Sequence, residues 1–255
     1  MHQHMEPQAY VTSAEDKGVA TLTFFHPQHN AMPSDLLAKL RQAIVQAGQD
    51  PAVKVIVLCS AGERSFCAGA SFEELVAIEN KAQGEAFFNG FAQVINAMRL
   101  CPKFIIARIH GKAVGGGVGL AASADYALAS QYASVKLSEL SIGIGPFVVA
   151  PAIARKIGVS ALGQMTLNAK TFYTAQWAKD KGLFAEVLPD AQALDDAIET
   201  LCHELKSYHP EAMAEMKRVL WSGTEHWETL LAERAAISGG LVLNDFTKAT
   251  LERFK

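Results

Sequence analysis

The chain has 255 residues, of which 50% are hydrophobic and 19% charged, a composition that is ordinary for a globular protein with a substantial core. Its formal net charge is −3 and its basic residues are scattered, which argues against a surface that binds nucleic acid. The four cysteines are widely separated and lack C-x-x-C spacing, so a zinc site, a redox motif and a disulfide framework are not expected.

The first half of the chain alternates between strand-like and helix-like segments. Three leucines and an isoleucine between residues 36 and 44 recur at helical spacing, and Pro33 and Ser34 before them are typical of a helix start. Short helices are also predicted after Ser71 and as far as Ala124. Five segments predict strands: Val19–Phe25, Val53–Gly62, Lys103–Gly111, Tyr126–Ser130 and Ser134–Ser138. Strands separated by helices imply an α/β architecture with crossover connections.

The pattern changes at about Ala152 to helices joined by short loops. Ala185–Pro189 predicts one more short strand, and nearly everything beyond Asp190 is helical in character. We therefore expect an α/β core over residues 1–190 and a C-terminal helical region over residues 191–255. A region of this kind often packs subunits together.

Two short glycine-bearing segments stand where a strand-like run gives way to a helix: Cys67–Ser71 and Gly115–Gly119. Such junctions can present backbone N–H groups to one negatively charged oxygen, as stabilisation of an enolate or a tetrahedral oxyanion requires. The N–H of Ala70 is a candidate donor because the dipole of the following helix assists it. The run of three glycines is also typical of a tight turn with close helix–strand packing, so both interpretations stay open.

A dinucleotide-binding site is an alternative interpretation of the second segment. Gly117, Gly119 and Ala122 fit G-x-G-x-x-A, and Glu139 follows about twenty residues later. We discount this alternative because the intervening helix is short and because two predicted strands, instead of one, precede Glu139.

Glu139 lies in a predominantly apolar stretch, between Leu137 and Leu140 and just before GIGPF. A carboxylate in such surroundings is either a salt-bridged structural residue or a base whose pKa is raised by desolvation. The sequence leaves these two roles open. Two oxyanion donors and one base would together suit proton chemistry beside a carbonyl group.

Taken together, these residues resemble the crotonase (enoyl-CoA hydratase/isomerase) superfamily over nearly the whole chain. The segments that carry the resemblance are His29–Leu40, Ser65–Leu75, Ile109–Ser130, Ala178–Pro189 and Asn244–Phe254. No single segment is decisive, but their order and spacing are highly specific. The resemblance implies a spiral of ββα units, a C-terminal helical region for trimerisation and an acyl-CoA thioester substrate.

The resemblance also implies roles for individual residues. The amides of Ala70 and Gly116 would form an oxyanion hole for the thioester oxygen, and Glu139 would be the acid/base. Substrate-binding positions would be Ala31, Ala68, Ser71, Phe72, Gly115, Gly119, Ser138, Gly143 and Phe147.

One departure from the family's pattern bears on the reaction. Hydratases of the family use two glutamates to hold and split water, and the first of these falls on Gly119, which has no side chain. Stabilising an enolate needs only the two amides, and one carboxylate can move a proton between C2 and C4 of an enoyl thioester. Ser71, where aspartate is common, and Val148–Pro151 are further departures. We expect double-bond isomerisation or hydration; the alternatives are an acyl-CoA decarboxylase and a non-catalytic acyl-CoA-binding subunit.

The expected partners follow from the same resemblance. Coenzyme A would enter as part of the substrate thioester, with no further cofactor and no metal, in an enzyme of fatty acid metabolism that forms a homotrimer or a hexamer. No segment has the apolar length of a signal peptide or a transmembrane helix. We therefore expect a cytoplasmic enzyme that has neither a membrane nor a nucleic acid as a partner.

Overall fold

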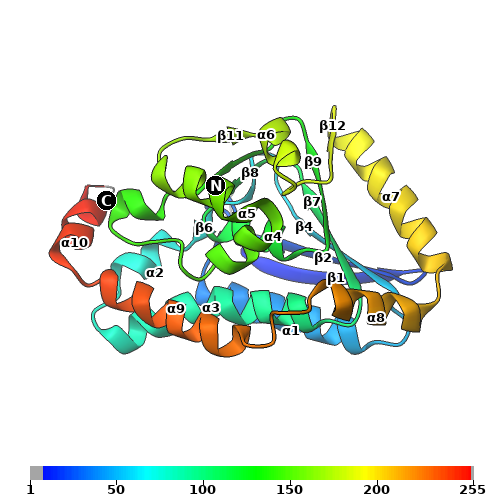
Figure 1. The fold of residues 1–255 in the computed structure, drawn as a ribbon, viewed down its shortest axis with the longest axis horizontal. Helices are drawn as coiled ribbons and strands as arrows, with labels where there is room; N and C mark the ends of the chain where they lie inside the picture. The colour runs from blue at the N-terminus through cyan, green and yellow to red at the C-terminus, as the bar shows by residue number, and fades with distance from the viewer. Residues whose placement is uncertain (1–7, 254–255) are drawn as a thin grey trace, which may run out of the picture.

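The computed structural model describes residues 8–253. Residues 1–7 and 254–255, which belong to the predicted core (1–190), to the predicted C-terminal region (191–255) and, for residue 254, to the segment Asn244–Phe254, lie outside the described part. A six-stranded sheet in the order β1-β2-β4-β7-β9-β12 forms its centre (Figure 1). The strands span Tyr10–Asp16, Val19–Phe25, Val55–Ser60, Phe104–Ile109, Tyr126–Ser130 and Glu186–Leu188. β1 and β2 are antiparallel, and every other pair of neighbours is parallel. Most residues of β4 and β7 are buried, as parallel strands covered on both faces should be.

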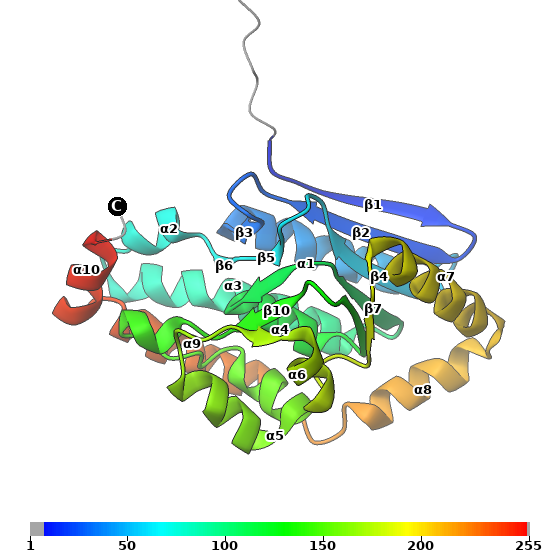
Figure 2. The same ribbon diagram turned by 90° about the horizontal axis from the view of Figure 1, so that it is seen from above.

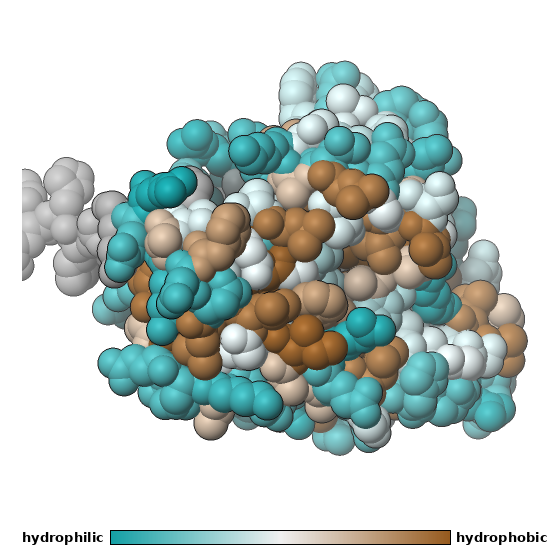
Figure 3. Space-filling model, turned by 60° about the vertical axis from the view of Figure 1, so that its left-hand side comes forward, coloured by the Kyte–Doolittle hydropathy of each residue, from teal (hydrophilic) through white to brown (hydrophobic). Residues whose placement is uncertain are grey.

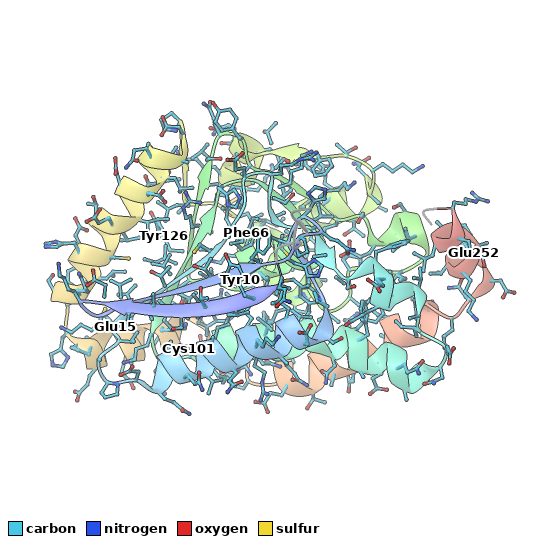
Figure 4. All side chains as sticks on the ribbon, turned by 180° about the vertical axis from the view of Figure 1, so that it is seen from behind. Tyr10, Glu15, Phe66, Cys101, Tyr126 and Glu252 are labelled. Atoms are coloured by element: carbon cyan, nitrogen blue, oxygen red, sulfur yellow. The ribbon has the colours of Figure 1, made fainter. Side chains whose placement is uncertain are left out.

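A smaller sheet lies beside the first, in the order β11-β10-β8-β5. Its strands span Tyr173–Thr174, Ser134–Lys136, Lys112–Val114 and Ser65–Cys67, and a separate short pair joins β3 (Ala31–Met32) to β6 (Gly69–Ala70). Phe66 of β5, labelled in Figure 4, packs edge-on against Phe24 of β2 with ring centroids 5.4 Å apart. These two buried rings join the sheets through one continuous core.

The chain passes repeatedly from the larger sheet to the smaller sheet and then into a helix. β4 and β5 lead through β6 into α2 (Phe72–Val76), and β7 and β8 lead into α4 (Gly116–Ser123). β9 and β10 lead into a 3-10 helix, η1 (Glu139–Ile142), and then into α5 (Ala150–Leu167). This path confirms the spiral of ββα units that the resemblance implies.

Two long helices cover one side of the core. α1 (Ser34–Gln49) follows Pro33, as predicted, and buries the leucines and the isoleucine of its periodic pattern. α3 (Lys81–Leu100), which the sequence patterns did not predict, packs beside α1. A further short helix, α6 (Ala175–Asp180), precedes β12.

Four helices follow the last strand: α7 (Ala191–Ser207), α8 (Pro210–Leu220), α9 (Trp227–Leu241) and α10 (Asp245–Glu252). α9 runs along α3 (Figure 2), so closely that a Cβ at Gly84 would lie 2.7 Å from the carbonyl oxygen of Gly239. α7 buries Leu194 and Ile198 against the larger sheet. The C-terminal helices thus pack on the α/β core of the same chain, and their part in trimerisation stays a prediction. No helix within residues 8–253 has both the length and the apolarity to cross a bilayer.

Candidate active site

Three parallel strands of the smaller sheet, β5, β8 and β10, end at the same edge. Beyond this edge the chain turns through residues 68–71 into α2, through Gly115 into α4 and through residues 137–138 into η1. Because the carboxyl ends of parallel strands are neighbours, the segments singled out in the sequence meet at one place.

The two glycine-bearing segments are in direct contact. Gly69 has a φ of +95°, and a Cβ on it would lie 3.0 Å from the carbonyl oxygen of Val114 and 3.7 Å from the amide nitrogen of Gly116. A Cβ on Gly117 would lie only 2.5 Å from the carbonyl oxygen of Cys67. Close packing therefore accounts for glycine at these positions, and it also brings the start of α4 against β6.

The N-terminus of α4 is held in a defined position. The N–H of Gly115 donates to the carbonyl oxygen of Lys136 at 2.9 Å, which ties the turn to β10. The N–H of Gly116 belongs to the first residue of α4 and has no carbonyl of an earlier helical turn to donate to. Both Gly116 and Ala70 line the same cavity. A Cβ on Gly116 would lie 2.2 Å from the ring of Phe91, so a side chain there would require this ring or the backbone to shift.

Glu139 lies at the same junction. Its carboxylate packs on Gly115, where a Cβ would be 2.8 Å from Oε1, and its Oε2 is buried with no hydrogen-bond partner. None of the ion pairs within residues 8–253 includes Glu139, which excludes the salt-bridged role there. Burial raises the pKa of Glu139 to about 7, against the opposing effects of two backbone hydrogen bonds and of the charge on Lys136.

A cavity of about 370 Å³ contains these groups. Apolar and aromatic side chains dominate its walls, among them Phe72, Phe87, Phe88, Phe91, Phe147 and Val149. Glu139 is the single acid and Lys136 the single base among the described residues that line it. The arrangement is an apolar chamber lined by Ala70, Gly116 and one carboxyl of raised pKa.

The structure brings most of the predicted site residues together in this cavity. The predicted residues that line it are Ala68, Ala70, Phe72, Gly115, Gly116, Ser138, Glu139 and Phe147. The predicted residues outside its lining are Ala31, Ser71, Gly119 and Gly143.

Each of these four residues has a different position in the structure. Ala31 pairs with Gly69 between β3 and β6, and the Ser71 hydroxyl accepts from the N–H of Glu74 and so caps α2. Gly119 lies under Val149, as described below. Gly143, with a φ of +82°, ends η1 against α10.

The sequence patterns missed several residues that line the cavity. Phe87, Phe88 and Phe91 come from α3, and Ser238 comes from α9. The three phenylalanines lie on neighbouring turns of one helix, a spacing that could have identified them as one face. Nothing in the local sequence indicates that Ser238, far along the chain, reaches the same cavity.

The dinucleotide-binding alternative does not fit the observed fold. In that motif the acidic residue follows the next strand along the chain, whereas β9 and β10 both lie between α4 and Glu139. Glu139 also packs on Gly115 at the start of the same glycine segment.

Comparison with known proteins adds an independent line of evidence. A family model described as enoyl-CoA hydratase/isomerase matches residues 14–242. A short-chain-enoyl-CoA hydratase of Clostridium acetobutylicum is 30% identical over 223 residues, which are 87% of this chain and 84% of that protein. A peroxisomal Delta(3,5)-Delta(2,4)-dienoyl-CoA isomerase of Arabidopsis thaliana is 28% identical over 226 residues, 82% of this chain and 80% of that protein.

The fold is matched by solved structures as well. The crystal structure of an enoyl-CoA hydratase from Bacillus halodurans superposes with a TM-score of 0.90, over 96% of this chain and 99% of that one. The sequence identity is 21%, so this likeness concerns the fold alone.

Proposed function

Since this chain belongs to the enoyl-CoA hydratase/isomerase family, we propose that it moves the double bond of an enoyl-CoA thioester by transferring one proton between C2 and C4. The chain is an acyl-CoA enzyme of the hydratase/isomerase type by its family, and the choice of reaction within that type is our proposal. The single observation that carries it is that Glu139, with a free and buried Oε2, is the only acid lining the cavity within the described part of the chain.

The first step in the proposal is polarisation of the thioester carbonyl. With the carbonyl oxygen between the N–H groups of Ala70 and Gly116, negative charge that develops on this oxygen is stabilised as the proton leaves the neighbouring carbon. The apolar walls strengthen these hydrogen bonds because water is displaced when the substrate fills the chamber. Removing one donor of this kind typically slows a reaction by about a hundredfold or more.

The proton then moves through Glu139. Its carboxylate takes the proton from C2 of a 3-enoyl thioester, and the electron pair of that C–H bond passes into a dienolate whose charge rests on the thioester oxygen. The same carboxyl returns the proton to C4, which re-forms the carbonyl and leaves the double bond between C2 and C3. No other reactant is needed, and the reverse direction uses the same steps.

Hydration is less well supported because a side chain at position 119 has no room. The resemblance places the first hydratase glutamate at Gly119, where a Cβ would lie 2.4 Å from Cγ1 of Val149. Real Cβ atoms do not approach other atoms so closely, so Val149 occupies the space that a side chain at 119 would need. Two departures from the family's pattern, Gly119 and Val149, therefore complement each other.

The test of this proposal is Glu139→Gln, which keeps the shape of the side chain and removes its basicity. We expect the turnover of a 3-enoyl-CoA to fall by about a thousandfold, in the range that general acid–base catalysis contributes. Binding of the ester, measured by calorimetry, should change little because both N–H groups remain.

Glu73→Gln is the matched control, because Glu73 is an exposed carboxylate on α2 that does not line the cavity. A Glu139→Gln enzyme that keeps more than about a tenth of wild-type turnover would refute the assignment of Glu139 as the base.

A further inference from the structure

The polar side chains that line the cavity containing Glu139 come from two parts of the chain. Among the described lining residues, all but one of these polar side chains belong to residues 136–141, the segment that carries Glu139 itself. The remaining one is Ser238 of α9. It is the only polar side chain that the helices α2, α3 and α9 contribute to the described lining, where the other residues of these helices are phenylalanines and a leucine.

The hydroxyl of Ser238 is buried without a partner. Ser238 is 1% exposed, and its hydroxyl forms no hydrogen bond within residues 8–253. By contrast, the buried hydroxyl of Ser123 in α4 donates to the carbonyl oxygen of Gly119, four residues earlier, at 2.8 Å. A buried hydroxyl that lacks a hydrogen bond costs free energy. A ligand in the cavity that supplied the missing partner would remove this cost.

The packing of α9 on α3 does not require a hydroxyl at position 238. The close contact is made by the next residue, since a Cβ at Gly84 would lie 2.8 Å from Cα of Gly239. Alanine at position 238 would be smaller than serine, would form the helix at least as well and would bury no polar atom. The oxygen of Ser238 is therefore the atom that the fold itself does not explain.

The position of Ser238 relative to the reacting atoms follows from α3. Phe91 lies against Gly116, whose N–H is the proposed donor to the thioester oxygen. Gly84, which contacts the residue after Ser238, precedes Phe91 by seven residues, or about 10 Å along a helix. The intervening turn of α3 supplies two more rings of the cavity wall. A ligand whose thioester lies at Gly116 and whose acyl chain follows α3 reaches Ser238 beyond these rings.

The surroundings of Ser238 are apolar. The N–H of Val242, one turn later, donates to the carbonyl oxygen of Ser238 at 3.0 Å, and Val242 belongs to a buried cluster with Leu75 of α2, Phe87 of α3 and Leu251 of α10. Figure 3 views the side of the molecule where α2 and α10 lie, and apolar residues gather there with hydrophilic residues around them. An uncharged polar group is the partner that such walls suit, because a charge would be costly to bury against them.

We propose that Ser238 selects substrates whose acyl chain carries an uncharged oxygen, as a hydroxyl or a carbonyl group, beyond the carbons that react. A serine hydroxyl both donates and accepts, so it can hydrogen-bond either group. The inference rests on the proposed function in that the cavity takes the acyl part of a thioester, and it adds the class of acyl group. No bond is made or broken at Ser238, which acts on recognition alone.

The test compares Ser238→Ala with the wild type on saturated acyl-CoA esters of increasing chain length, each with and without a hydroxyl on its last carbon. These esters lack the double bond that the proposed reaction moves, so calorimetry measures binding alone. At the chain length that reaches α9, we expect the affinity for the hydroxylated ester, relative to its parent ester, to fall by about three- to tenfold in the variant, the effect of one neutral hydrogen bond. Unchanged binding of the parent esters shows that the variant is folded.

Ser60→Ala is the matched control. Ser60 of β4 is also a buried serine whose hydroxyl has no hydrogen-bond partner, but it does not line the cavity, and its loss should leave the ratio of affinities unchanged. A fall of less than about threefold in Ser238→Ala at every chain length would overturn the inference, because Ser238 would then serve only the packing of α9. Since no turnover is measured, this result is distinguishable from failure of the proposed reaction, which the Glu139→Gln enzyme reports.

Discussion

The Glu139 carboxyl is buried where most of its neighbours are apolar, at the first residue of η1 and against the bare backbone of Gly115. Its free Oε2 means that a proton can be gained or lost without breaking a hydrogen bond to the protein. A base with a pKa near the working pH offers both a usable ionised fraction and a strong affinity for the proton it takes. Burial raises the pKa of Glu139 to about 7, which suits that task.

The pH profile of the enzyme should report this titration. Proton abstraction needs the ionised carboxylate, so kcat/KM should be constant above about pH 7 and fall about tenfold per pH unit below it. Activity is lost on the acid side because the carboxylate becomes protonated there. Since the pKa of Glu139 is raised, this loss begins well above the ordinary value of 4.5. A profile that stays flat from pH 5 to pH 8 would contradict the burial of the catalytic group.

For individual residues, the sequence identified the candidates for the site but not the side chains that surround them. It showed that Glu139 has apolar neighbours along the chain and that Ala70 and Gly116 lie at strand-to-helix junctions. That Val149 lies over Gly119 depends on how α5 packs on α4, which no local pattern contains. The sequence therefore left both roles of Glu139 open, and the tertiary contacts exclude the salt bridge.

Among the elements, α8 is fixed by a buried ion pair. Lys217 Nζ lies 2.8 Å from Oδ2 of Asp125 and donates to the carbonyl oxygen of Lys103, and both charged side chains are almost completely buried. Asp125 also accepts from the N–H of Ile105 and from Nε1 of Trp221. This network joins the C-terminal helices to the start of β7 and to the turn before β9.

Lys217→Met should destabilise the fold strongly. The variant leaves the buried Asp125 carboxylate without its ion-pair partner, and breaking a buried ion pair in this way typically costs about 3–5 kcal/mol of unfolding free energy. Urea denaturation would measure the change, with the exposed Lys179→Met as the control. A difference below about 1 kcal/mol would mean that the pair contributes no more than a surface ion pair.

The strength of periodicity decided which elements the sequence could predict. α1 has an uninterrupted apolar face and was predicted, and β2, β4 and β7 of the larger sheet carry clear β-branched runs. β5, β6 and β8 have only two or three residues each, too few for a period to show. α3 contains Gly84 and Gly90, which pack on α9 and on Leu37 and lower its helix propensity. Tertiary contacts therefore stabilise the helix that supplies the aromatic wall of the cavity.

For the whole molecule, the resemblance predicts a homotrimer or a hexamer. Three large apolar residues of η1, α10 and the loop after α5, namely Leu140, Phe246 and Phe172, are 44%, 64% and 41% exposed. Exposed apolar residues in one region favour burial against another protein surface. Light scattering should give three or six times the mass of the chain, and a monomer at micromolar concentration would contradict the prediction.

Proton transfer by Glu139 is measured most directly by incubating a 3-enoyl-CoA with the enzyme in deuterated water and following the products by mass spectrometry. We expect a 2-enoyl-CoA as the first product, isomeric with the substrate apart from deuterium exchanged through Glu139. Recovery of the 3-enoyl-CoA unchanged, by an enzyme that converts a 2-enoyl-CoA to its 3-hydroxyacyl-CoA, would contradict it, because the reaction would then be water addition and not proton transfer between C2 and C4.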